Sequence, residues 1–439
     1  MIEPLPEALV PRRPTGGANL AIQLYDGPIV VTQGNSRVEE QGTVRLSWQQ
    51  GTNLRFEVPD VNPRTYLELD EAQLRLEDSR APLPAQLTSI RRRIQDGKPT
   101  LAIAGRVEAT VIGEGPATTV QFLVGNFPSY IGTGVSRGAS SEDSARLTLE
   151  FREWVIDLDM VEGGRDMFKE VKASGGFAAT LVGRLRRSDR RGFSRESAED
   201  VLHGLFLFLS FVAGDWSPII LPQGLDQDGN PVWERWAAPL SRPWSDRFTW
   251  FAPQKPQGLS GLFAGFMSRF TESGTVRAIG DLVQLYCHAN GHVLIEPRIV
   301  LANAALELLA WMHSSEGGRA KTDSPRALLE AATQAGLGIP SEVLPNLSAY
   351  AKQRGWEDGV FAIAEMRNGL LHPGSRAKLF TAESKARVEA WQLAMYYIEV
   401  GMLCWLDYRG EFLDRLRAEH VWESTEPPWR DQAKPADSP

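Results

Sequence analysis

The sequence predicts an α+β multidomain protein, in which an N-terminal antiparallel β-sandwich or barrel-like domain precedes a C-terminal all-α bundle. Up to about residue 255, short runs alternate apolar and polar residues, which is the two-residue period of half-buried strands. From residue 256 onward, apolar residues recur with the 3.6-residue period of amphipathic helices. The length of 439 residues corresponds to two or three domains of ordinary size.

The strands of the first part are expected wherever such an alternating run lies between turn residues. They are residues 43–48, 53–58, 73–77, 101–112, 119–124, 146–151, 154–158 and 178–182. Glycine- and proline-containing pairs separate the runs, as turns do. About ten short strands without intervening helical patterns favour a sandwich or a barrel.

One helix and one hairpin are expected within this β-rich part. The helix covers residues 194–213, because a serine at 194 or 197 and acids at 199 and 200 are typical of a helix N-terminus. The hairpin lies near residues 216–237, with its turn at the Asp-Gly-Asn sequence of residues 228–230.

The second part is expected to contain six or seven helices. They are residues 262–270, 276–286, 297–310, 328–335, 343–352, 357–371 and 383–408. Glycines at 336 and 338 and the Pro-Gly pair at 373–374 are helix stops. The predicted domains are therefore a β-rich domain at 1–255, a helical domain at 256–425 and a flexible tail at 426–439, which is rich in proline, charge and serine.

Composition limits the possible compartments and partners. The net charge of −8 argues against wholesale nucleic-acid binding, although it leaves room for a local basic cleft. Two cysteines, Cys287 and Cys404, are too few for a disulfide framework, and their spacing does not fit a zinc site. Because the N-terminus lacks a signal-peptide pattern and no run approaches the ~20 apolar residues of a membrane span, we expect a cytoplasmic protein without membrane contact.

One segment combines residues that suit chemistry on a phosphodiester: Arg367, Asn368 and His372. Pro373 disfavours the α-helical conformation at His372, so the segment closes the predicted helix. Asn368 and His372 are four residues apart and share a face, where the amide can orient the imidazole. Arg367 lies about 140° around the helix axis from His372, so it reaches across or meets its counterpart from another copy. Arginine binds phosphate oxygens, and histidine moves protons at neutral pH.

The Arg-Asn-x-x-x-His sequence at 367–372 resembles the signature of the HEPN family (higher eukaryotes and prokaryotes nucleotide-binding). A bare R-x4-H spacing also occurs at Arg415 and His420, and the asparagine directly after Arg367 distinguishes the two. The likeness covers about residues 270–410. The layout is also similar to bacterial anti-phage HEPN proteins with an N-terminal β-rich domain.

The resemblance implies a C-terminal up-down HEPN bundle that acts as a metal-independent, cofactor-free endoribonuclease. It implies a homodimer with a composite site at its interface, a single-stranded or tRNA-like RNA substrate, and attack by the ribose 2′-OH. The biological role would be toxin-like or in antiviral defence. The β domain would then sense or respond to a phage-derived or cellular trigger. The alternative is a non-catalytic HEPN module that binds nucleotides or a partner protein. A third possibility is a carbohydrate- or peptide-binding β domain, with the helices serving dimerisation alone.

The resemblance also assigns roles to individual residues. His372, helped by Asn368, would activate the 2′-OH or protonate the leaving oxygen, and Arg367 would stabilise charge on the phosphoryl group. Glu307 is a single acid in an apolar run and is a candidate supporting partner for Arg367. The alternatives are a structural helix-end pair of Arg367 with Glu365 or Glu307, and a surface position for Glu307.

Two clusters of arginine are candidate electrostatic tracks for RNA. The first comprises Arg184, Arg186, Arg187, Arg190 and Arg191. The second is the run Arg91-Arg92-Arg93. Because few aromatic residues lie near the first cluster, the sequence favours a solvated loop for both clusters over an RNA-binding surface.

Overall fold

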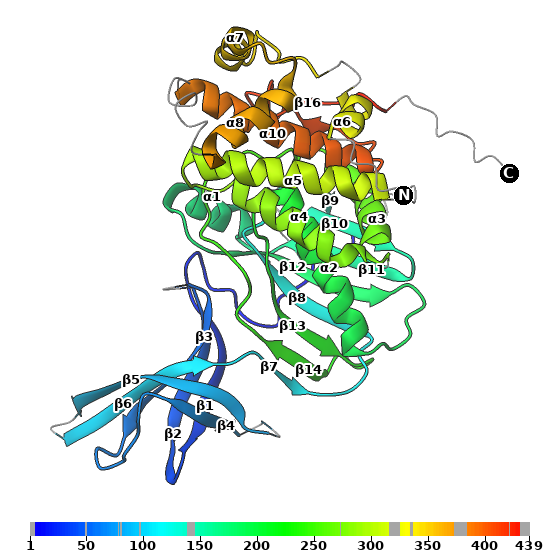
Figure 1. Cartoon of the computed structure of the whole chain (residues 1–439). Helices are drawn as coiled ribbons and strands as arrows, with labels where there is room; N and C mark the ends of the chain where they lie inside the picture. Colours follow the sequence, from blue (N-terminus) through cyan, green and yellow to red (C-terminus); the bar gives the residue numbers. More distant parts are fainter. Residues whose placement is uncertain are drawn as a thin grey trace.

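The computed structural model is an α+β multidomain protein with an antiparallel β-rich N-terminal region and a helical C-terminal region (Figure 1). It describes residues 5–48, 51–77, 79, 81–95, 98–137, 145–272, 274–315, 325–333, 337–372, 384–420 and 422–430. The N-terminal region itself comprises a closed barrel and a separate eight-stranded sheet, and the helices cover the sheet. None of the helices in these ranges is both long enough and apolar enough to cross a membrane.

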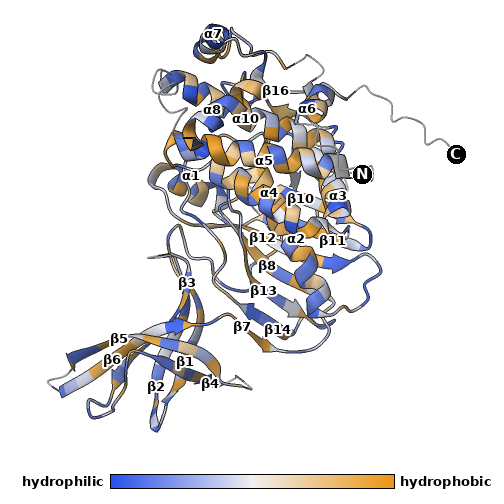
Figure 2. Cartoon of the chain, viewed as in Figure 1, coloured by the Kyte–Doolittle hydropathy of each residue, from blue (hydrophilic) through white to orange (hydrophobic). Residues whose placement is uncertain are grey.

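In the described residues, six antiparallel strands close into a barrel in the order β1-β2-β3-β6-β5-β4. They are β1 (Ile22–Gln33), β2 (Ser36–Ser47), β3 (Asn53–Val61), β4 (Glu71–Leu76), β5 (Leu83–Gln95) and β6 (Lys98–Val107). Apolar residues alternate with polar ones along these strands (Figure 2), so that leucine, isoleucine and valine fill the interior.

The sequence did not predict two of the barrel strands. The Asp-Gly-Pro sequence within β1 is typical of a turn, but barrel pairing keeps Gly27 opposite Gly42 and Pro28 opposite Gln41. The run Arg91-Arg92-Arg93, expected in a loop, lies in β5 and pairs with β6. Pairing with neighbouring strands therefore overrides the local signals at both places.

The second β unit is an antiparallel sheet in the order β7-β14-β13-β8-β12-β11-β10-β9. Its strands are β7 (Thr110–Gly113), β8 (Thr119–Gly125), β9 (Thr133–Gly134), β10 (Ala145–Phe151), β11 (Trp154–Met160), β12 (Ala179–Arg187), β13 (Ile219–Leu225) and β14 (Pro231–Trp236). Both faces of its centre are covered. In β8, Phe122 and Val124 belong to the apolar cluster shared with the helices, whereas Leu123 belongs to the cluster shared with the barrel.

The helices stack on one face of this sheet (Figure 1). They are α2 (Arg195–Ala213), α3 (Gly258–Phe270), α4 (Thr275–Ala289), α5 (Ile295–Ser315), α6 (Pro325–Thr333), α7 (Pro345–Arg354), α8 (Gly359–Leu371) and α10 (Ser384–Trp405). The long α10 packs against α4, α5, α6, α7 and α8. α1 (Gly164–Ser174), which the sequence did not predict, packs on β12 and contributes to the cluster shared with the barrel.

The apolar clusters therefore divide the chain differently from the predicted domains. Within the range 1–255, expected to be one β-rich domain, the barrel has its own interior, and the helix-covered face of the sheet shares one continuous core with the helices. The two β units meet where the indole of Trp48 stacks on Phe177, with ring centroids 5.2 Å apart. The predicted helix 194–213 and hairpin near 216–237 are present as α2 and as β13 with β14.

The predicted flexible tail at 426–439 packs against the helical region at its start. The Trp429 side chain is buried, and its Nε1 donates a hydrogen bond to the carbonyl of Tyr408 at 2.9 Å. Burial of this large apolar ring outweighs the proline-rich composition around it. The rest of the predicted tail, residues 431–439, lies outside the described residues, as do the predicted helix stops at 336 and 373–374.

Candidate functional site

The Arg-Asn-x-x-x-His segment forms the last turn of α8. The helix begins at Asp358, whose carboxylate accepts a hydrogen bond from the Phe361 N–H at 2.9 Å. It ends at His372, which has an extended backbone (φ −102°, ψ 115°) and donates its N–H to the Asn368 carbonyl at 3.0 Å. This end agrees with the constraint that a following proline imposes.

The guanidinium of Arg367 is held by two helices. Its Nη2 lies 2.5 Å from Glu307 Oε1 on α5, and its Nη1 donates to Asn368 Oδ1 at 3.0 Å. Asn303, one turn before Glu307, donates its amide to the same Oε1 at 2.8 Å. The Arg367 side chain is 26% exposed and that of Glu307 is 54% exposed, so the pair lies at the surface of the α5–α8 contact.

Asn368 does not have the partner that the sequence predicted. Its Oδ1 accepts from Arg367, and its Nδ2 donates to Glu365 Oε1 at 3.2 Å. Among the described residues, no hydrogen bond joins the Asn368 amide to the His372 imidazole. The reason is that His372 leaves the helical conformation, so the i,i+4 alignment with Asn368 does not continue to its side chain. Asn368 therefore orients the arginine and not the histidine.

His372 lies exposed at the end of α8, next to the exposed Leu371. In the part of the chain that the structure describes, no hydrogen bond links its imidazole to Arg367. The structure thus brings together Glu307, Arg367 and Asn368 of the predicted site, whereas His372 is exposed and, within the described ranges, makes no side-chain hydrogen bond to them. A surface guanidinium and an exposed imidazole near one helix end can bind a phosphate and move a proton.

The first arginine cluster is not a loop, because β12 extends five residues beyond its predicted end. Arg184, Arg186 and Arg187 lie in this strand, whereas Arg190 and Arg191 follow it. The carboxylate of Asp157 on β11 lies 2.8 Å from Arg184 and 3.7 Å from Arg186. Strand pairing places Asp157 directly opposite Arg184, which explains this neutralisation.

A second carboxylate neutralises the end of the same cluster. Asp189 lies 2.8 Å from Arg187 and 3.8 Å from Arg191. The hydrogen bonds from Arg187 and from the Arg191 backbone hold the pKa of Asp189 at about 2. With acids paired to most of its arginines, this cluster offers less attraction for a polyanion than its composition suggests.

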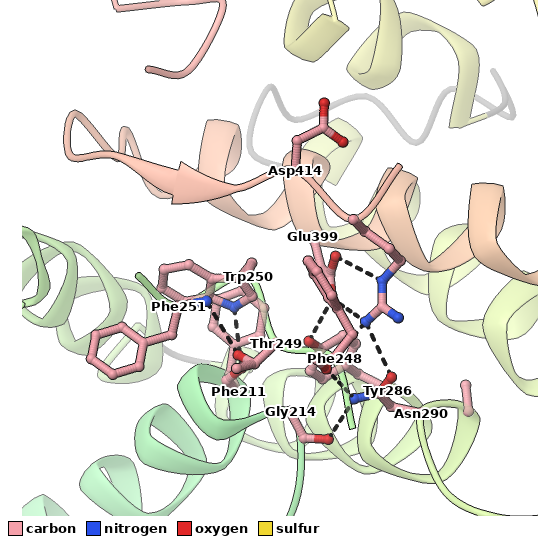
Figure 3. A network of polar contacts seen from close by, with 12 residues as sticks. Phe211, Gly214, Phe248, Thr249, Trp250, Phe251, Tyr286, Asn290, Glu399 and Asp414 are labelled. Carbon is pink, nitrogen blue, oxygen red and sulfur yellow. Dashed lines mark hydrogen bonds and ion pairs between the residues drawn. The ribbon is translucent and has the colours of Figure 1, made fainter. Parts of the chain in front are cut away.

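Of the second R-x4-H spacing, Arg415 belongs to a buried structural network (Figure 3), whereas His420 is exposed and lies outside it. Arg415 Nε and Nη2 lie 3.0 and 2.5 Å from the two carboxylate oxygens of Glu399 on α10, and these side chains are only 3% and 1% exposed. Tyr286 donates its hydroxyl to Glu399 at 2.8 Å. Burial, together with the Glu399 carboxylate, raises the pKa of Tyr286 well above its ordinary value.

Asn290 extends this network to the segments around the sheet. Its Oδ1 accepts from Arg415 at 3.1 Å, and its Nδ2 donates to the carbonyls of Gly214 and Phe248 at 2.9 Å each. The network therefore ties α10 and α4 to the end of α2 and to the linker after the sheet (Figure 3). The sequence signal that could have identified it is Glu399, the one acid in the largely apolar run from Ala390 to Trp405.

Two family models match the chain. Residues 113–247 match the YopA central domain, and residues 273–426 match the YopA C-terminal domain. The chain is 24% identical over 426 residues to the SPbeta prophage-derived uncharacterized protein YopA of Bacillus subtilis (strain 168), and the alignment covers 94% of this chain and 96% of that protein. No solved structure matches. The two matched segments correspond to most of the sheet and to most of the helical region, and the barrel precedes both.

Proposed function

We propose that this protein is a metal-independent endoribonuclease of the HEPN type, which cleaves RNA by attack of the ribose 2′-OH. The observation that carries the proposal is the Arg367 guanidinium, held at the surface by Glu307 and Asn368 in the same helical turn that leads to the exposed His372. We further propose a toxin-like or anti-phage role, in which the N-terminal β units sense a trigger or restrain the site.

The proposed reaction is a transesterification within the RNA. A base removes the 2′-OH proton, the 2′ oxygen forms a bond to phosphorus, and the bond from phosphorus to the 5′ oxygen breaks. The 5′ oxygen takes up a proton, which leaves a 2′,3′-cyclic phosphate and a 5′-hydroxyl. Arg367 would bind the non-bridging oxygens, on which negative charge develops, and His372 would transfer one of the protons.

The contacts of Arg367 leave donors for such a substrate. A guanidinium has five N–H groups. The bonds to Glu307 and Asn368 use Nη2 and Nη1, one N–H each, and the other N–H groups have no partner among the described residues, so they can bind phosphate oxygens. The two protein contacts fix the plane of the Arg367 guanidinium, which reduces the conformational entropy that the side chain loses when a phosphate binds.

The separation of His372 from Arg367 within one chain fits a composite site, in which two copies of the protein each supply one of these residues. The His372 ring leaves the face of α8 that carries Asn368, and no hydrogen bond joins it to Arg367 among the described residues. At 100° per residue, the exposed Phe361 lies within about 20° of Asn368 around α8, and the exposed Leu371 lies about 60° from it. A second copy seated on this partly apolar face would cover both side chains and bring its own His372 towards Arg367.

Incubation of the purified full-length protein with a labelled single-stranded RNA tests this proposal. We expect cleavage that persists in EDTA, yields 2′,3′-cyclic phosphate ends and spares DNA of the same sequence. Arg367→Ala and His372→Ala should each abolish it. Arg277→Ala and His420→Ala are matched controls, because both side chains are exposed and lie outside the site. Cleavage that survives both site variants, or its absence from the folded full-length protein at every condition tested, overturns the proposal.

The second candidate function is a non-catalytic module that binds nucleotides or a partner protein. The observation that favours it is the Glu307 carboxylate, which already neutralises Arg367. A nucleotide-dependent increase in Tm without RNA cleavage, lost in Arg367→Ala, would identify this function.

A further inference from the structure

A row of arginines crosses three neighbouring strands of the barrel. Strand pairing places Arg45 of β2 opposite Arg55 of β3, and Arg55 opposite Arg106 of β6. Arg45 and Arg106 are exposed, and Arg55 is half-buried. Like charges directly opposite each other destabilise a sheet, since such side chains start from Cβ atoms about 5 Å apart. The row is therefore an arrangement that folding alone does not favour.

The row lies beside a hollow on the outer wall of the barrel. The hollow has a volume of about 330 Å³, and its arginines are Arg45, Arg55, Arg91 and Arg93. Between them lie small side chains, including Ala102, Ala104 and Ser89, which leave the space open. We call this feature, lined by the four arginines, the arginine groove.

Positive charge in the arginine groove is largely uncompensated. Glu57 is the one carboxylate among the lining residues, and it lies 3.6 Å from Arg93. Arg91 donates its Nε to the hydroxyl of Ser89 at 3.1 Å, and among the described residues no carboxylate forms an ion pair with it. Within the described ranges, neither Arg45 nor Arg55 has an acidic partner. Four guanidinium groups against one carboxylate give the groove a charge of about +3 in a chain of net charge −8.

We infer that the arginine groove binds the phosphodiester backbone of single-stranded RNA; the choice of RNA rests on the proposed function. The row of Arg45, Arg55 and Arg106 starts in the groove and continues past its edge, and its two strand spacings span about 10 Å, which is longer than a single phosphate group. An extended polyanion matches this length, and its phosphates neutralise the repelling arginines.

The side chains of the arginine groove can bind phosphates but offer no surface for base stacking. Its one aromatic lining residue, Phe56, is only 1% exposed and points into the barrel, so the groove offers no stacking platform. Binding is therefore independent of base sequence and sensitive to salt. The barrel would retain RNA while the helical region cleaves it, which gives the N-terminal unit a function in substrate capture.

Fluorescence anisotropy with a 5′-fluorescein-labelled 20-nucleotide RNA tests the inference. The background is full-length His372→Ala, so that the probe is not cut. Adding Arg45→Ala and Arg55→Ala should weaken binding at least ten-fold. It should also reduce the slope of log Kd against log salt concentration by about 1.4, at about 0.7 for each phosphate contact to a single strand.

The matched control adds Arg37→Ala and Arg75→Ala instead, which removes two exposed arginines of the same barrel outside the groove. It should retain the affinity and the slope. Folding is monitored by Tm, which the Arg45 and Arg55 changes should leave unchanged or raise, since they relieve repulsion.

Three outcomes overturn the inference. The first is a groove variant that keeps the RNA affinity of the His372→Ala background. The second is an equal loss in both, which indicates a non-specific charge effect. The third is no RNA binding together with binding of labelled poly-glutamate, which assigns the groove to an acidic protein segment. Groove-dependent RNA binding by a wild-type protein that does not cleave RNA would instead refute the proposed function and leave this inference intact.

Discussion

The guanidinium of Arg367 on α8 lies 2.5 Å from the carboxylate of Glu307 on α5. The sequence separation of 60 residues makes this pair a tertiary contact, and Asn303 and Asn368 hold its two members through further hydrogen bonds. A charge-assisted hydrogen bond of this kind holds the Arg367 side chain in one orientation, whereas an unpaired arginine on a helix surface samples several rotamers. It also makes Glu307 a positioning residue whose removal has a measurable consequence.

Glu307→Ala should lower kcat for RNA cleavage about ten-fold, which corresponds to about 1.4 kcal/mol in the activation barrier. KM should change little, because in the proposed site Glu307 orients Arg367 and leaves RNA binding to the guanidinium. Glu307→Asp should restore part of the rate. Steady-state kinetics measures both constants, with the exposed acid Glu330→Ala as control. An unchanged or increased kcat would contradict a positioning role.

Asn368→Ala should also reduce kcat, because it removes a hydrogen bond from the Arg367 guanidinium. The midpoint of the pH–rate profile should stay where it is, since Asn368 does not bond the His372 ring. Measurement of the rate between pH 5 and 9 separates this result from the alternative. A displaced midpoint would show that the amide acts on the histidine, as the helical spacing first suggested.

Removal of one member of the buried pair should destabilise the fold. We expect Arg415→Met or Glu399→Gln to lower the free energy of unfolding by about 3–5 kcal/mol, because each leaves a buried partner uncompensated. Urea denaturation followed by tryptophan fluorescence measures the loss. Arg417→Met, two residues along and 73% exposed, is the control and should cost less than about 0.5 kcal/mol. Equal losses for Arg415 and Arg417 would refute the structural role of the network.

The stability of the protein should fall at mildly acidic pH. Burial lowers the pKa of His203, and burial together with the charge of Arg242 lowers the pKa of His288. The unfolded chain therefore binds more protons than the folded chain. The contribution of these two histidines to the free energy of unfolding is fully present above about pH 6.5. It is lost as the pH falls below that value, because the unfolded chain then takes up protons first.

Urea denaturation at pH 5.5 and 7.5 tests this pH dependence. His203→Gln combined with His288→Gln should reduce the difference between the two values, whereas the exposed His313→Gln should leave it unchanged. A wild-type protein that is more stable at pH 5.5 than at 7.5 would contradict the assignment to these two histidines.

Much of the secondary structure follows from short windows of sequence. The Ser194 hydroxyl accepts the Ser197 N–H at the start of α2, as a serine before an apolar periodic run predicts. α8 ends at His372 because of the proline that follows. The pairing of β13 with β14 likewise agrees with the predicted turn between them. Each of these features depends on residues within a few positions of one another.

Other features depend on residues that are far apart in the chain. Local composition placed Arg91 and Arg184 in loops, but pairing with β6 and with β11 places them in strands. Asn368 has Arg367 and Glu365 as its partners because the histidine leaves the helix.

The sequence by itself determined the change from strands to helices near residue 255 and the location of the Arg-Asn-x-x-x-His segment, since periodicity and spacing are local properties. Only the tertiary structure decided that six strands close into a barrel apart from the sheet, and that Arg415 meets Asn290 across 125 positions. Neither could be read from a window of sequence, because the free energy of such contacts depends on the whole arrangement that brings their partners together.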